Sequence, residues 1–161
     1  MKTAIVNASP LIILSRAGYL DLLPKLFSHV IVPRAVVREI MAGPANDPAI
    51  GAISGADWLA VIDLAPAISP LATWRLGRGE TEVLELARQT IGAWSVLDDK
   101  AARRAAVALC LPIVGTLGIL VAATQAGWLT DFGIAAESAK RAGLYIDPGI
   151  VTKLVKQTRR P

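Results

Sequence analysis

The chain has 161 residues, of which 53% are hydrophobic and 19% charged, with a formal net charge of +4. This length supports one substantial hydrophobic core and is short for two, so we expect a single domain over residues 1–161. The lone Cys110 excludes a disulfide within the chain and fits a reducing cytoplasm, while the positive charge favours a polyanionic partner.

Short β-branched runs alternate with helical patterns in the first half of the chain. Strands are predicted at TAIVN (3–7) and HVIVP (29–33), and an outer strand within GADWLAVIDL (55–64). One helical stretch follows the first strand and continues through LDLLPKLF (20–27), and a second helical pattern covers RAVVREIM (34–41). A loop rich in Gly, Pro, Asn and Asp follows at residues 43–48. This alternation is typical of an α/β fold with a central parallel sheet.

The second half continues the same alternation and ends in helices. The predicted elements are a helix from about Gly79, a strand at AWSVL (93–97), a helix at 100–109, a strand at PIVG (112–115) and a buried helix at 118–126. Asp131 and Asp147-Pro148 have the pattern of helix starts, and Gly143 marks a stop between them. Residues 131–161 are therefore predicted to form a helical C-terminal extension.

Two segments resemble membrane signals. The apolar amino terminus is interrupted by Asn7 and Pro10 and followed by Arg16, which is a poor pattern for a secretory signal peptide. Residues 105–130 carry no charge and are long enough to span a bilayer, but proline and glycine residues divide them. We interpret them as a buried strand leading into a helix, and expect no membrane association.

Polar and acidic side chains are placed at the ends or starts of the predicted elements. Ligands of open α/β sheets bind outside the carboxyl ends of the strands. Five residues can face such a crevice: Asn7, Glu39, Glu80, Asp98 and Thr116. Each acid taken alone is more readily explained as a helix cap or a solvated residue. Together they offer the oxygen ligands that a hard cation such as Mg²⁺ prefers.

Other classes of site are disfavoured by what the sequence lacks. No G-x-G-x-x-G pattern follows the first strand, which argues against a nucleotide-cofactor protein. His29 is the only histidine and has no second His or Cys nearby, so neither a zinc site nor a Ser/His/Asp triad is expected.

In order and spacing, several segments resemble the PIN-domain family. They are IVNASPLIILSRAGYLDLLPKLF, VIVPRAVVREI, GRGETEVLELA, SVLDDKAARRAA and PIVGTLGILVAATQAG. The resemblance extends to about Ala126 and is closest to the PIN-like, VapC-related toxins of prokaryotic toxin–antitoxin modules. It implies a three-layer α/β fold, with a central parallel sheet flanked by helices, and Mg²⁺- or Mn²⁺-dependent endonuclease activity on RNA. It also implies a homodimer silenced by a small cognate antitoxin protein.

The resemblance also assigns roles to particular residues. Glu39, Glu80 and Asp98 match the catalytic carboxylates, and the implied metal ligands are Asn7, Glu39, Glu80 and Asp98, with Asp99 as a further candidate. Ser9 and Thr116 match polar positions that line the family's site. Because adjacent residues leaving a strand point apart, we interpret Asp98 as the ligand and Asp99 as the cap of the next helix. Arg103 either stabilises phosphate charge or is a solvated helix residue.

Two departures from the family pattern leave two functions open. Asn7 stands where the wider family has a carboxylate, and an amide oxygen can bind a metal but brings no charge. The stretch GTLGIL lacks the family's late acid. The leading hypothesis is a metal-dependent ribonuclease in which a bound cation activates water. The alternative is a catalytically weak or inactive PIN-like module that binds nucleic acid or docks an antitoxin.

Overall fold

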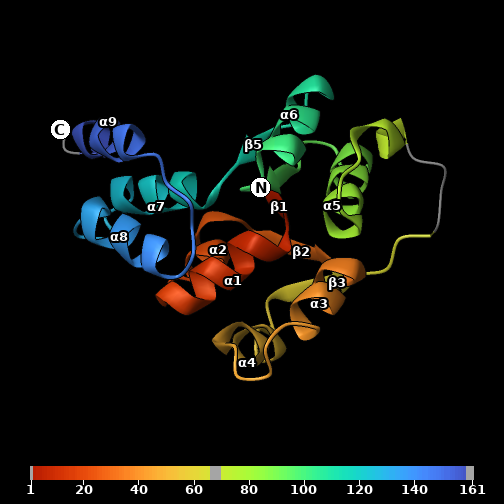
Figure 1. Cartoon of the computed structure of the whole chain (residues 1–161), viewed down its shortest axis with the longest axis horizontal. Coiled ribbons are helices and arrows are strands. Elements are labelled where there is room, and N and C mark those ends of the chain that lie inside the picture. The colour runs from red at the N-terminus through yellow and green to blue at the C-terminus, as the bar shows by residue number, and fades with distance from the viewer. Residues whose placement is uncertain (1, 66–69, 159–161) are drawn as a thin grey trace.

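A computed structural model of the chain describes residues 2–65 and 70–158. Its strands form one parallel sheet with the order β3-β2-β1-β4-β5 (Figure 1). The strand bounds are Thr3–Val6 (β1), His29–Pro33 (β2), Leu59–Ile62 (β3), Trp94–Val96 (β4) and Ile113–Val114 (β5). The predicted α/β class and the outer position of β3 are thereby confirmed.

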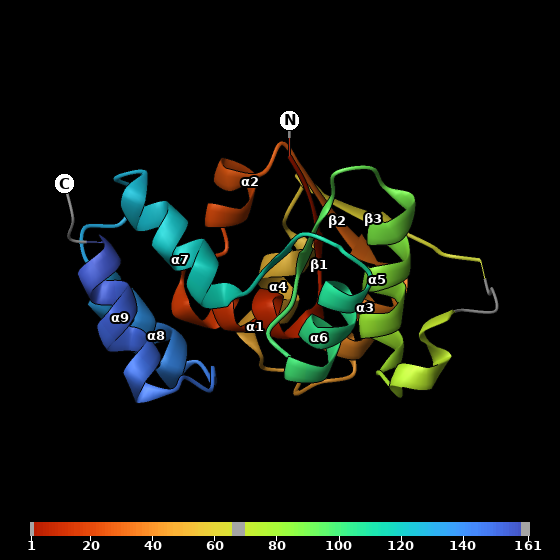
Figure 2. The ribbon, with the colours of Figure 1, turned by 90° about the horizontal axis from the view of Figure 1, so that it is seen from above.

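Helices cover both faces of this sheet. Their bounds are Ala8–Ala17 (α1), Leu22–Leu26 (α2), Arg34–Met41 (α3), Pro48–Ser54 (α4), Arg78–Gln89 (α5), Lys100–Ala108 (α6), Thr116–Gln125 (α7), Phe132–Arg141 (α8) and Pro148–Thr158 (α9), with a 3₁₀ turn at Pro70–Trp74. The helices α1, α2 and α7 lie on one side of β1 and α5 on the other, with α8 and α9 outside α1 and α7 (Figure 2). The molecule therefore has the expected three layers.

Two local features differ from the sequence prediction or were absent from it. The single helical stretch predicted from the first strand through residue 27 is in fact two helices, α1 and α2, because Gly18 adopts a left-handed φ of 77° and ends α1. The helix α4 was not predicted. It begins at an Asp-Pro pair, where Asp47 accepts a hydrogen bond from the Ala49 N–H at 3.0 Å. The same pair at residues 147–148 was recognised as a helix start.

The C-terminal helices begin where the sequence places them. The Asp131 side chain accepts from the Ile134 N–H at 3.1 Å, which caps α8. The Asp147 side chain accepts from the Gly149 N–H at 2.8 Å at the start of α9. Between the two helices, Gly143 has a φ of 113°. Residues 159–161 of the predicted extension lie outside the described residues.

The uncharged segment 105–130 is divided among the end of α6, the short strand β5 and α7. Pro112 and Gly115 lie in the connections on either side of β5. Over the part of the chain that the structure describes, no helix combines the length and hydropathy needed to cross a bilayer.

The central strand β1 fixes the position of everything at its carboxyl end. Its residues Ala4, Ile5 and Val6 have no exposed surface, because neighbouring strands flank it and helices cover both faces. Asn7 follows directly, and its N–H donates to the Val96 carbonyl of β4 at 3.1 Å. The strand order turns back between β1 and β4, so the crevice favoured for ligands in such sheets lies beside Asn7.

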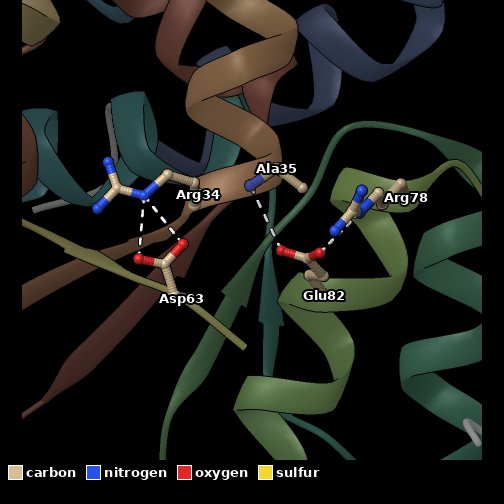
Figure 3. Close-up of polar contacts among 5 residues, drawn as sticks. All are labelled: Arg34, Ala35, Asp63, Arg78 and Glu82. Atoms are coloured by element: carbon tan, nitrogen blue, oxygen red, sulfur yellow. Dashed lines mark hydrogen bonds and ion pairs between the residues drawn. The ribbon is translucent and has the colours of Figure 1, made fainter. Parts of the chain in front are cut away.

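Polar contacts hold α3 against its neighbours (Figure 3). Glu82 of α5 accepts from the Ala35 N–H, in the first turn of α3, at 3.4 Å and from Arg78 Nε at 3.0 Å. Arg34 Nε donates to both carboxylate oxygens of Asp63, just after β3, at 2.9 and 3.1 Å. The Glu82 contact sets α3, which carries Glu39, relative to α5, which carries Glu80.

We predict that Glu82→Ala lowers the free energy of unfolding by about 1–2 kcal/mol, because the N–H of buried Ala35 loses its acceptor. Asp63→Ala removes only an exposed ion pair and should lower the free energy of unfolding much less than Glu82→Ala does. Urea unfolding of both variants measures the difference. Equal costs for the two variants would show that the Glu82 contact does not hold α3.

Candidate functional site

The candidate site consists of two groups of side chains at the carboxyl ends of β1 and β4. The first group surrounds Gly79 and contains Asn7, Glu39 and Glu80. The second surrounds Gly115 and contains Ser9, Asp98, Arg103 and Thr116. The groups are joined through the Asn7–Val96 backbone hydrogen bond and by Ser9 Oγ, which donates to Asp98 Oδ2 at 3.4 Å.

In the first group, two side-chain oxygens converge on a glycine. A methyl group at Gly79 would lie 2.9 Å from Glu39 Oε2 and 3.3 Å from Asn7 Oδ1. The separation of the two oxygens is therefore at most the sum of these distances. Asn7 is buried, and its Oδ1 atom has no hydrogen-bond partner among residues 2–65 and 70–158. Since a buried acceptor without a partner is costly, the Asn7 oxygen is suited to receive a donor or a cation.

The charges in this group repel each other. Glu39 is exposed as a whole, but its Oε2 atom lies over Gly79, and partial removal from water raises the pKa of its carboxyl group. The nearby Glu80 carboxylate raises the Glu39 pKa further. Glu80 itself accepts from the Gly77 N–H at 2.9 Å, which satisfies the first turn of α5. The group thus has excess negative charge.

In the second group, Thr116 holds the Asp98 carboxylate at both oxygens. The Thr116 N–H donates to Asp98 Oδ1 at 2.8 Å, and Thr116 Oγ1 donates to Asp98 Oδ2 at 2.7 Å. Thr116 is fully buried at the start of α7. Asp98 is therefore fixed in orientation and also satisfies the amino terminus of that helix.

Arg103 lies beside Asp98 but is held by the backbone. Its Nη1 atom donates to the Leu97 carbonyl at 2.9 Å. A methyl group at Gly115 would lie 2.9 Å from Arg103 Nη1 and 3.0 Å from Asp98 Oδ1, so both side chains meet at this glycine. No ion pair joins them, and the rest of the guanidinium makes no hydrogen bond within the described residues.

Asp99 takes the role of helix cap. Its Oδ1 atom accepts from the Ala101 N–H at 2.7 Å and from the Ala102 N–H at 2.9 Å. The prediction that Asp99 caps the helix beginning at Lys100 is confirmed. Its assignment as a further metal ligand stays a prediction.

The predicted ligands are not gathered into one cluster. Within residues 2–65 and 70–158, no three Asp, Glu, His or Cys side chains form a group that could hold a metal ion. The donor chemistry nevertheless suits a hard cation, because the four predicted ligands offer carboxylate or amide oxygens. The orphaned Asn7 oxygen and the repulsion between Glu39 and Glu80 are both conditions that a cation would relieve.

Sequence reasoning did not identify the two glycines that make room for these groups. Each directly precedes a predicted site residue at the start of a helix: Gly79 before Glu80, and Gly115 before Thr116. The signal that could have identified them is this shared position, a glycine directly before a predicted site residue. Glu82 was also missed, because its contact with Ala35 joins residues far apart in the sequence.

Comparison with known proteins gives one family match. A family model described as DUF3368, a PIN domain, matches residues 3–160. A solved structure with a related fold is a PilT N-terminus domain protein from the hyperthermophilic archaeon Sulfolobus solfataricus P2. The two are 14% identical with a TM-score of 0.47, over 90% of this chain and 97% of that chain. No curated protein matches the sequence.

We predict that Glu39→Gln stabilises the metal-free protein at pH 7. Because the folded state raises the Glu39 pKa, the folded protein binds this proton more tightly than the unfolded chain does. Ionisation therefore costs stability as the pH rises through that pKa, and the glutamine avoids the cost. Thermal unfolding in EDTA should show a higher midpoint for Glu39→Gln at pH 7 and a vanishing difference towards pH 4.

The matched control for this measurement is Glu137→Gln, which changes an exposed glutamate of α8. It should not reproduce the pH-dependent gain. A Glu39→Gln protein no more stable than wild type at pH 7 would contradict the repulsion inferred here.

Proposed function

Because the chain belongs to the PIN-domain family, we propose that it is a metal-dependent endoribonuclease that hydrolyses RNA phosphodiester bonds. The fold of this family is a nuclease-type fold. The observation that carries the proposal is the buried Asn7 oxygen without a partner, which lies with Glu39 beside Gly79 at the sheet's switch point. An oxygen-rich, negatively charged crevice suits a hard cation and, through it, a phosphate.

Asn7, Glu39, Glu80 and Asp98 would hold the Mg²⁺ or Mn²⁺. When bound, such an ion lowers the pKa of a coordinated water and offsets the charge of the phosphate. Thr116 fixes the Asp98 carboxylate through two short hydrogen bonds, so this oxygen pair is preorganised. Arg103 is held beside Asp98 by its hydrogen bond to the Leu97 carbonyl. The remaining N–H groups of its guanidinium can donate to phosphate oxygens. Ser9 gives Asp98 a further donor.

We further propose that the chain is the toxin of a toxin–antitoxin module, acting in the cytoplasm as a homodimer that a small antitoxin protein silences. This part rests on the likeness to PIN-like toxins of the segments at 5–27, 30–40, 77–87, 95–106 and 112–127. The residues that support it are the retained Glu39, Glu80 and Asp98.

A second candidate function is a catalytically weak or inactive module that binds nucleic acid or docks an antitoxin. It is favoured by Asn7, which brings no charge, and by the contacts of Glu80 and Asp98 with helix amino termini. Calorimetric titration with Mn²⁺ separates the two functions. A nuclease binds Mn²⁺ more tightly than its Asp98→Ala variant does, whereas an inactive module binds it no better.

We predict that Asp98→Asn and Glu39→Gln each reduce Mn²⁺-dependent RNA cleavage by about 100-fold or more, because each removes a ligand charge at nearly constant volume. The matched control is Asp99→Asn, which removes a charge from the adjacent residue while keeping a side chain that caps α6. Cleavage of labelled RNA, with circular dichroism to check folding, measures the effect. If Asp99→Asn lost as much activity as Asp98→Asn, the assignment of Asp98 as the ligand would be wrong.

We predict that Asn7→Asp tightens Mn²⁺ binding. The new carboxylate would lie beside Glu39 and add charge where the orphaned amide oxygen now stands. In EDTA the same variant should be less stable than wild type, because a buried carboxylate next to Glu39 is repelled. Calorimetry with Mn²⁺ and thermal unfolding in EDTA test the two effects. Weaker Mn²⁺ binding by Asn7→Asp would contradict a cation site at this position.

A further inference from the structure

A basic groove borders the second group of the candidate site. Its volume is about 590 Å³, and it is lined by Lys100, Arg103, Arg104, Val107 and Ile113. Arg103 and Arg104 follow Lys100 by three and four residues on α6, so both lie about one helical turn from Lys100 on the same side of the helix. Because Arg103 lies both in this groove and beside Asp98, the groove leads directly to the candidate site.

Two of the three cations in the groove have no acidic partner in the part of the chain that the structure describes. Lys100 and Arg104 are exposed, and neither has an acidic partner among residues 2–65 and 70–158. The polar residue nearest in sequence, Asp99, is engaged in capping α6. Cations without acidic partners attract phosphate groups. A groove lined by them that leads to the proposed phosphate position is therefore suited to bind a nucleic-acid strand.

An aromatic ring is displayed beside these cations. Tyr145, in the segment between α8 and α9, is 81% exposed, whereas its neighbours Leu144 and Ile146 are each only 8% exposed. The two buried neighbours anchor the segment and direct the ring outward. The Lys100 Nζ atom lies 5.7 Å from the centre of the Tyr145 ring. The exposed ring of Tyr145 therefore lies next to the basic side of α6.

Because the Tyr145 ring is exposed, it gains little stabilisation from packing against the core. Packing therefore does not explain its position. Single-stranded nucleic acids are held by this combination: bases stack on an aromatic face while cations contact the phosphates. A base paired within a duplex cannot present its face to such a ring. The chemistry thus distinguishes an unpaired strand from a duplex.

We propose that Tyr145, Lys100 and Arg104 form a subsite that holds an unpaired nucleotide adjacent to the phosphate at Asp98 and Arg103. The base stacks on the Tyr145 ring, and the cations contact the flanking phosphates. The identification of the strand as RNA rests on the proposed function, but binding at the subsite requires neither metal nor cleavage.

The test measures binding of a labelled single-stranded RNA of about 12 nucleotides by fluorescence anisotropy in EDTA. Tyr145→Ala should weaken binding by about tenfold, the loss expected for one stacked base. Tyr145→Phe keeps the ring and should bind within about twofold of wild type. Trp128→Ala removes another exposed aromatic, located after the far end of α7, and should have no effect.

A second arm uses duplex RNA of the same length. The wild type and Tyr145→Ala should bind the duplex equally, because no unpaired base is present to stack. Lys100→Gln and Arg104→Gln should each weaken binding to both the single strand and the duplex. Each should also lower the slope of log binding constant against log salt concentration by about one, because one phosphate contact is lost. Equal binding of the single strand by wild type and Tyr145→Ala would overturn the subsite, as would an equal loss on the duplex.

Cleavage with Mn²⁺ is measured separately, so that the two proposals fail differently. If the wild type binds single strands through Tyr145 but does not cleave them, the nuclease proposal fails and the subsite stands. If the wild type cleaves RNA and Tyr145→Ala binds it equally well, only the subsite fails. Since Tyr145 is exposed, thermal unfolding of the variants should match wild type.

Discussion

The arrangement of the candidate site depends on one constraint, the burial of a polar amide at the end of the central strand. Ala4, Ile5 and Val6 of β1 are fully buried, and Asn7 continues this strand into the crevice with an oxygen that has no partner among the described residues. Such a group costs about 1–3 kcal/mol. Because Gly79 has no side chain, the charge of Glu39 can also approach the amide closely. Stability is thus sacrificed at the switch point, as is usual for binding sites.

The two halves of the site share a design in which an acid meets a glycine at the start of a helix. Glu80 satisfies an N–H at the amino terminus of α5, and Asp98 does so for α7. Cap and ligand are therefore not exclusive roles for these acids. A carboxylate already oriented by a helix terminus needs little further ordering to accept a cation on its remaining lone pairs.

The sequence predicted what depends on local patterns. Alternating β-branched runs located the strands, and the Asp99 cap followed from the opposed directions of adjacent residues. The break at Gly18 was missed because a short turn between two apolar helices leaves their hydrophobic pattern continuous. The pairing of Asp98 with Thr116 and of Glu82 with Ala35 depends on side-chain orientations across the sheet, which periodicity does not encode. The pattern also did not predict that the acids divide into two groups, one at Gly79 and one at Gly115.

The unequal lengths of the two edge strands limit how copies of this protein can associate. A two-residue strand such as β5 offers too few free backbone groups to template another strand. At the opposite edge, β3 is four residues long and is followed by the charged Asp63, paired with Arg34. Both edges therefore resist continuation of the sheet into a neighbouring molecule. Self-association is left to helical surfaces, and the protein is protected from edge-to-edge aggregation despite its high apolar content.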